Sequence, residues 1–308
     1  MIASAAVRRE LLDLALPIVG EPSEVRDASW DHGESEVWRV SGPLATVAVK
    51  AHRQGRKFDQ ELTAYRDWLP ALAAGGGGSP VSARGWAWVG APGVRTPRLL
   101  AHRVEHPRAL VLSWEEGAVL EGARPGRREE LGLRERAGAF LRALHDLPHD
   151  DVDPVPLSDA YASRLDAWSR RSRGVVPEAV VANVRAAVAE ALPALSKEAR
   201  VRCHRDYTAR NWLVAADGAL VVIDLEHARP DLRVADLERL WHGEWRRDPA
   251  LREAFLAGYG RELSAEEEET LRRLSALGAL STVVWAREHG DAAFEDHGWA
   301  ALRRLGLA

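Results

Sequence analysis

Hydrophobic and polar positions in the first third of the chain predict short strands around one helix. Residues 36–40 (EVWRV) and 46–50 (TVAVK) are rich in β-branched and aromatic side chains, and residues 41–43 (Ser-Gly-Pro) separate them as a turn. Residues 109–113 (ALVLS) form a compact apolar run, which predicts the last strand of this region. An apolar stripe at helical spacing lies between these strands and comprises Phe58, Leu62, Tyr65 and Leu69.

The remaining two thirds of the chain have mostly helical spacing of their apolar residues. A stripe that ends before Pro148 predicts one long helix, and further helices are expected over residues 159–169 and 177–195. Ser264 and Glu267 have the S-x-x-E spacing of a capping box, which marks the start of another helix.

One β-rich segment, residues 201–224, interrupts these helices. Residues 211–215 and 219–223 predict two strands, and residues 216–218 (Ala-Asp-Gly) join them as a hairpin turn. A strand-rich region followed by a helix-rich region with an embedded hairpin predicts an α+β fold.

The composition narrows the class of protein. The 308 residues are 46% hydrophobic and 29% charged, which is enough apolar material for a folded core. A net charge of −4 argues against a nucleic-acid binder, and the single cysteine, Cys203, suits a reducing cytoplasm. The amphipathic N-terminal segment lacks the pattern of a signal peptide or a membrane span. We therefore expect a cytoplasmic protein with no membrane, nucleic-acid or obligate protein partner.

Two short segments carry the strongest chemical signal, residues 203–211 (CHRDYTARN) and 223–226 (IDLE). Phosphoryl transfer needs a carboxylate to orient and deprotonate the acceptor hydroxyl, and oxygen ligands for Mg²⁺. Asp206 would supply the base, Asn211 a neutral oxygen ligand, and Asp224 the carboxylate that Mg²⁺ prefers. Because the hairpin returns the chain, Asn211 and Asp224 are expected to lie side by side.

HRDYTARN resembles the catalytic loop of the protein-kinase-like fold, and IDLEHA resembles the metal-binding segment of aminoglycoside phosphotransferases and choline-kinase-like enzymes. The resemblance covers nearly the whole chain. It implies a two-lobed fold with ATP and Mg²⁺ in the cleft: a small antiparallel-sheet lobe with one key helix (1–114), a hinge (115–118) and a mainly helical lobe (119–308). The alternative is a turn-capping pair, His204 with Asp206, beside an ordinary strand-end carboxylate.

Lys50 and Glu61 extend the resemblance upstream. Lys50 ends a strand at the place where a kinase-like fold has its phosphate-contacting lysine. Glu61 precedes Leu62 and shares the buried side of its helix, which is unusual for a carboxylate without a partner. Lys50 is the natural partner of Glu61, whereas Asp59 faces away from the stripe. A solvated lysine and a flank-facing glutamate are the alternative.

The resemblance implies two further nucleotide contacts. Residues 31–36 precede a strand where the family has a phosphate-covering loop, and Ser35 would offer its hydroxyl and backbone N–H. An ordinary hairpin loop is the alternative. Residues 109–117 (ALVLSWEEG) resemble the hinge, where backbone groups around Trp114 and Glu115 would hold adenine.

Arg210 stands one residue before Asn211 and is a candidate for catalysis. Its planar guanidinium is expected to reach either the transferring phosphoryl oxygens or the Asp206 carboxylate. An outward-facing loop arginine is the alternative.

The activity implied by the resemblance is an ATP- and Mg²⁺-dependent transfer of the γ-phosphate to a hydroxyl of a small molecule. An aminoglycoside or other antibiotic is the first candidate acceptor, with antibiotic resistance as the consequence, and choline, homoserine or a sugar is the alternative. A protein kinase is disfavoured because Asp236 follows Asp224 by twelve positions, which leaves no room for an activation loop. A non-catalytic nucleotide-binding module is the alternative of another class, although the complete residue set counts against it.

Acidic residues that follow the hairpin predict a hydroxylated acceptor that carries positive charge. These acids are Glu226, Asp231, Asp236, Glu238 and Glu244. Five arginines in the same stretch offset them, so a solvated, charge-balanced face is the alternative. These are Arg229, Arg233, Arg239, Arg246 and Arg247.

Overall fold

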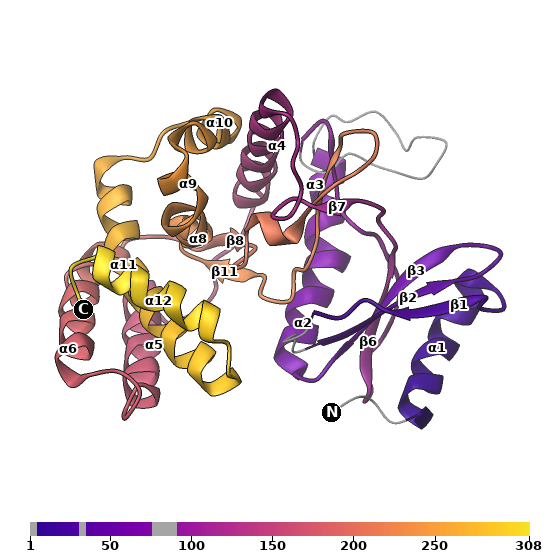
Figure 1. The fold of residues 1–308 in the computed structure, drawn as a ribbon, viewed down its shortest axis with the longest axis horizontal. Helices are drawn as coiled ribbons and strands as arrows, with labels where there is room; N and C mark the ends of the chain where they lie inside the picture. Colours follow the sequence, from indigo (N-terminus) through magenta and orange to yellow (C-terminus); the bar gives the residue numbers. More distant parts are fainter. Residues whose placement is uncertain (1–4, 31–34, 76–90) are drawn as a thin grey trace. The chain divides into compact units, whose positions relative to one another are not determined.

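The computed structural model describes residues 5–30, 35–75 and 91–308 (Figure 1). Packing groups the chain into two compact units. The first unit comprises residues 1–147, 204–229 and 254–260, and the second comprises 148–203, 230–253 and 261–308. The lobe boundaries at 114 and 119 stay a prediction, because these units follow packing rather than the change from strands to helices.

An antiparallel five-stranded sheet dominates the N-terminal part of the first unit, with strand order β1-β2-β3-β6-β5. The three strands that the pattern predicts are present as β2, β3 and β6. The strands are β1 (Glu24–Asp27), β2 (Ser35–Ser41), β3 (Thr46–His52), β5 (Leu99–Arg103) and β6 (Arg108–Ser113).

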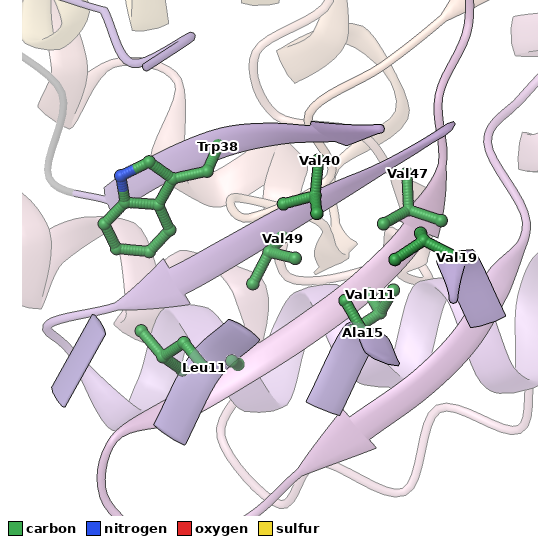
Figure 2. Packing of buried hydrophobic residues seen from close by; sticks show 9 residues of the cluster. Leu11, Ala15, Val19, Trp38, Val40, Val47, Val49 and Val111 are labelled. Atoms are coloured by element: carbon green, nitrogen blue, oxygen red, sulfur yellow. The ribbon is translucent and has the colours of Figure 1, made fainter. Parts of the chain in front are cut away.

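Helix α1 (Ala5–Val19) covers one face of this sheet (Figure 2). Trp38 lies opposite Val49 and Val40 opposite Val47 in the β2–β3 ladder, so their side chains point to the same face. These residues pack with Leu11 of α1 into a cluster from which water is excluded. Full burial of one such aliphatic side chain contributes about 1.5–3 kcal/mol. Since side chains alternate along a strand, Lys50 leaves β3 on the other face.

A second helical segment lies against β3 and β6 and carries the predicted stripe. It consists of α2 (Gly55–Thr63), a π-helical turn (Ala64–Trp68) and α3 (Leu69–Gly75). All four residues of the stripe are buried, as the spacing predicts, and Glu61 is buried beside them.

A smaller sheet of the first unit contains the predicted hairpin, and its strand order is β4-β10-β9-β7. The hairpin strands β9 and β10 pair antiparallel with Trp212 opposite Val222, and Gly218 in their turn has φ +77°. The strands are β4 (Val94–Arg95), β7 (Ala118–Val119), β9 (Trp212–Val214) and β10 (Leu220–Val222).

Within the first unit, helix α4 (Arg127–His145) is crossed at close range by the C-terminal half of α10 (Pro249–Tyr259). A Cβ at Gly138 of α4 would lie 1.9 Å from the carbonyl oxygen of Phe255. A Cβ at Gly258 of α10 would lie 1.8 Å from the carbonyl oxygen of Glu135. Glycine at both positions therefore permits the close packing that supports the loop before β9.

The second unit is mainly helical. The expected helix over residues 177–195 is divided into α6 and α7 near Glu190, whereas the capping box of Ser264 with Glu267 is present at the start of α11. No helix of the described residues combines the length and apolar character needed to cross a membrane. The helices are α5 (Leu157–Arg171), α6 (Glu178–Ala189), α7 (Leu192–Leu195), α8 (Glu238–His242), α9 (Glu244–Arg247), α11 (Ala265–His289) and α12 (Ala292–Arg304).

Short strands and 3₁₀ turns complete the structure. They are β8 (Val201–Cys203), β11 (Arg229–Asp231), the 3₁₀ turn η2 (Ala209–Asn211) and the 3₁₀ turn η3 (Arg233–Asp236). The single cysteine, Cys203, ends β8 and is buried.

Candidate active site

The loop between β8 and β9, residues 204–211, is anchored by aromatic and histidine side chains. Tyr207 is buried, and its hydroxyl donates a hydrogen bond to the Ala137 carbonyl of α4 at 2.8 Å. His204 is also buried. Its Nδ1 accepts from the Asp206 backbone N–H at 3.3 Å, so Nε2 donates to the Ile223 carbonyl at 3.1 Å. His204 therefore ties the loop to the segment that carries Asp224.

Asp206 is buried and its carboxylate is held from two sides. Arg210 and the side-chain amide of Asn211 each donate to Oδ2 at 2.9 Å. Burial alone would lower the pKa of Arg210, but the charge and hydrogen bond of Asp206, together with the nearby charges of Asp224 and Glu121, raise the pKa. Of the contacts expected for Arg210, the structure shows the one with the Asp206 carboxylate.

Asn211 is fully buried, and its amide group is oriented by its contacts. The amide nitrogen donates to the backbone carbonyl and to the carboxylate of Asp206, both at 2.9 Å. Within the described part of the chain, the Asn211 side-chain oxygen has no hydrogen-bond partner. The backbone N–H of Ile223 donates to the Asn211 carbonyl at 3.0 Å, so Asn211 lies beside the segment of Asp224. A buried acceptor oxygen next to a carboxylate fits a site for Mg²⁺.

Asp224 and Arg205 are, among the described residues, the non-glycine residues with positive φ, at 64° and 67°. Such backbone conformations are costly and collect at functional sites. Asp224 Oδ1 accepts from Lys50 Nζ at 2.7 Å. Burial, with Glu226 and Glu61 nearby, raises the pKa of Asp224 despite the opposing charge of Lys50. The site thus has a surplus of negative charge, which a divalent cation would offset.

Lys50 and Glu61 form the pair that the sequence predicts. Lys50 Nζ lies 2.9 Å from Glu61 Oε2, and both side chains are buried. Burial alone would lower the pKa of Lys50, but Asp224, Glu61 and then Glu226 raise it well above its usual value. Glu61 Oε1 also accepts from the backbone N–H of Leu225 at 3.2 Å, so it holds the main chain next to Asp224.

Sequence reasoning missed His52 and Lys57 as members of this network and expected a different role for Glu226. His52 Nε2 lies 2.9 Å from Glu61 Oε2, and Lys57 Nζ donates to Glu226 Oε1 at 2.7 Å. The sequence places Glu226 among the acids expected near the acceptor, whereas it contacts Lys50 at 3.1 Å. The helical spacing held a signal for Lys57, because a residue four positions before Glu61 shares its face.

The remaining predicted residues lie at the edges of the network. The Ser35 hydroxyl donates to Glu226 Oε2 at 3.0 Å, while residues 31–34 of the proposed phosphate loop lie outside the described residues. Trp114 and Glu116 line a pocket of about 290 Å³, together with Arg39 of β2. The side chain of Glu115 is not among those that line this pocket.

Glu115 is buried and accepts a hydrogen bond from the Ser113 hydroxyl at 2.9 Å. Burial raises the pKa of Glu115 from 4.5 to about 7, against the opposing effects of Ser113, Arg95 and Arg98. Between these two pH values the folded protein keeps a proton that the unfolded chain releases. The free energy of unfolding therefore falls as the pH rises through this window.

Glu115→Gln should remove this pH dependence. We expect the variant to exceed the wild type in stability by about 1–3 kcal/mol at pH 8, and the difference to vanish near pH 4.5. Urea unfolding at both pH values measures the effect, with the exposed neighbour as a control in Glu116→Gln. Equal pH dependence in wild type and Glu115→Gln would contradict the assignment.

Lys50 and Glu61 should behave as a coupled pair. If Glu61 acts by orienting Lys50, replacing Glu61 in a protein that already lacks Lys50 should cost little more. The loss of kcat/KM in the double variant should therefore be about tenfold smaller than the product of the two single losses. A double-mutant cycle on kcat/KM for nucleotide tests this, with unfolding followed separately. Strictly multiplicative losses would show that the two side chains act independently.

Comparisons with known proteins identify the family and the fold of the chain. The family model described as the phosphotransferase enzyme family matches residues 24–277. The gentamicin complex of APH(2″)-IIa is 16% identical with a TM-score of 0.66, and the alignment covers 98% of this chain and 96% of that chain. The GDP and kanamycin complex of APH(2″)-IIia is 12% identical with a TM-score of 0.68, covering 96% and 98%. Aminoglycoside phosphotransferase APH(4)-Ia is 14% identical with a TM-score of 0.67, covering 97% and 99%.

No sequence among the curated proteins matches the chain. At the identities of the solved structures the likeness establishes the fold, which confirms the predicted kinase-like α+β architecture. The family model extends over well more than half of the chain, so the protein belongs to the phosphotransferase enzyme family.

Proposed function

We propose that this phosphotransferase moves the γ-phosphate of ATP to a hydroxyl group of a small molecule. The observation that carries the proposal is the cluster of Asp206, Asn211, Asp224 and the Lys50–Glu61 pair within one compact unit. Phosphoryl transfer requires mainly positioning and charge stabilisation, and these groups are of the types that supply both.

Asp206 would orient the acceptor hydroxyl and take its proton at the carboxylate. Arg210 holds that carboxylate at Oδ2 and limits its rotation. Lys50, with its pKa raised, stays protonated and would contact the nucleotide phosphates. Burial in this network strengthens the attraction between the ammonium group and phosphate oxygens.

Asn211 Oδ1 and the Asp224 carboxylate would hold Mg²⁺. When bound, Mg²⁺ offsets the charge of the triphosphate. The surplus of carboxylates around Lys50 is consistent with a second cation in the site. Solved structures of the same fold include the streptomycin–ATP ternary complex of APH(2″)-IIa, which supports a nucleotide as phosphoryl donor.

The acceptor that we propose is an aminoglycoside or a related hydroxylated amine, because solved structures of the fold hold gentamicin and kanamycin. The acids after the hairpin give little support of their own. Glu226 pairs with two lysines, and Asp231 is buried against Arg164 at 2.9 Å. The positive charge of the acceptor therefore stays a prediction.

A screen for acceptor-dependent ADP release tests the proposal. Aminoglycosides, other hydroxylated antibiotics, choline, homoserine and sugars are offered with ATP, with and without Mg²⁺. We expect one chemical class of acceptor to stimulate ADP release, and only when Mg²⁺ is present. Turnover restricted to neutral or anionic hydroxyl compounds would overturn the cationic acceptor, and failure to bind any nucleotide would overturn the kinase assignment.

A further inference from the structure

Glu226 lies between two buried lysines and uses a different oxygen for each. Oε1 accepts from Lys57 Nζ at 2.7 Å. Oε2 lies 3.1 Å from Lys50 Nζ and accepts from the Ser35 hydroxyl at 3.0 Å. The carboxylate is 8% exposed, and the two lysine side chains are 8% and 6% exposed.

Lysine is rare in this chain, which makes the pair informative. The sequence holds three lysines, Lys50, Lys57 and Lys197, against 39 arginines. Two of the three meet at one carboxylate. An ammonium group is a compact point charge that suits a single carboxylate or phosphate oxygen, whereas the arginine fork is wider. Each oxygen of Glu226 faces a different ammonium group, Lys57 at 2.7 Å and Lys50 at 3.1 Å, and this arrangement suits an ionised carboxylate.

Oε2 of Glu226 occupies a place suited to a phosphate oxygen. The two groups that contact it, the Lys50 ammonium and the Ser35 hydroxyl, are the ones assigned above to nucleotide phosphates. An ionised carboxylate oxygen has the same hydrogen-bonding character toward these donors as a phosphate oxygen. A nucleotide phosphate and Glu226 Oε2 therefore compete for the same two donors.

We propose that Glu226 is an internal substitute for a nucleotide phosphate, and that Lys57 is the positioning residue that retains it when nucleotide binds. This inference rests on the proposed function. In the free protein, Oε2 neutralises Lys50 and engages Ser35. When phosphate oxygens take these donors, Glu226 stays paired with Lys57 through Oε1. Its negative charge is then compensated instead of facing the triphosphate without a partner, which would be costly in a buried site.

Affinities for ATP without Mg²⁺ test the proposal, because they isolate the phosphate contacts from the metal. We expect Glu226→Gln to bind ATP several-fold more tightly than the wild type, because the competing charge is gone. Lys57→Met should bind about tenfold more weakly, because Glu226 then depends on Lys50, with the His227 ring farther away at 3.7 Å from Oε1. The double variant should return to within a few fold of the wild type.

Calorimetric titration with ATP in the presence of a chelator measures all four proteins, and Lys197→Met, at an exposed lysine, is the matched control. A merely structural role for the pair predicts weaker binding in every variant, so the opposite signs for Glu226→Gln and Lys57→Met are diagnostic. If Lys57→Met does not fold, the ATP affinity of Glu226→Gln by itself tests the proposal. Unchanged or weaker binding in Glu226→Gln overturns the inference.

The same titrations separate this inference from the proposed function. Wild-type protein that binds Mg²⁺-ATP and turns it over, with no tightening in Glu226→Gln, overturns the role of Glu226 and leaves the kinase assignment standing. Wild-type protein that binds no nucleotide under any condition overturns both.

Discussion

Asp206→Asn should lower kcat by about 10²–10⁴-fold while the affinity for nucleotide stays within a few fold. Asparagine keeps the size of the side chain, and its oxygen still accepts from Arg210, but it cannot take the proton of the acceptor hydroxyl. The role that we assign to Asp206 concerns the acceptor, so ATP binding should be spared. Steady-state kinetics with the acceptor found by screening, together with ATP titration, measures the two effects separately.

The matched control for this variant is Asp59→Asn, since Asp59 lies on α2 with an exposed side chain. The control should retain wild-type kcat. Full turnover in Asp206→Asn would remove Asp206 from the reaction, and a large loss of ATP affinity would assign it to nucleotide binding instead.

Asp224→Asn should abolish most of the gain in ATP affinity that Mg²⁺ provides. Loss of a residue that hydrogen-bonds to a metal ligand typically lowers metal affinity about 10–100-fold. Loss of a charged ligand itself should lower it by about as much or more. Affinity for ATP without Mg²⁺ should be retained or improved, because Lys50 loses a carboxylate that now lies 2.7 Å from it. Titrations of ATP at several Mg²⁺ concentrations measure both effects.

Asn211→Ala serves as the graded comparison, because Asn211 offers a neutral oxygen in place of a charge. We expect its loss of Mg²⁺-ATP affinity to be smaller than that of Asp224→Asn. Equal affinity for Mg²⁺-ATP in wild type and Asp224→Asn would exclude Asp224 as a metal ligand.

Local sequence patterns anticipate the elements that position the site. The stripe from Phe58 to Leu69 predicts the buried side of α2, and with it the burial of Glu61. The hairpin turn at residues 216–218 predicts that Asn211 and Asp224 are brought together. These predictions succeed because turn chemistry and apolar period are properties of a few consecutive residues.

Contacts between residues far apart in the chain could not be predicted from the sequence. Lys57 and Glu226 are 169 positions apart, and no local pattern reports that their charges meet. The π-helical turn within the predicted helix cannot be detected from the spacing of apolar residues, since Tyr65 within the turn and Leu69 just after it both remain buried. The break near Glu190, in contrast, had a local signal: Pro193 stands in the first turn of α7, where a proline begins a new helix but cannot continue the preceding one.

The most direct test of the central claim is transfer of label from [γ-³²P]ATP to a small-molecule acceptor. Wild-type protein with Mg²⁺ should yield a labelled phosphate ester of a hydroxylated acceptor, and Asp206→Asn should yield about 10²–10⁴-fold less under the same conditions. Label that remains in ATP or appears only as inorganic phosphate with every acceptor tested, or ester formation that persists undiminished in Asp206→Asn, would contradict the account.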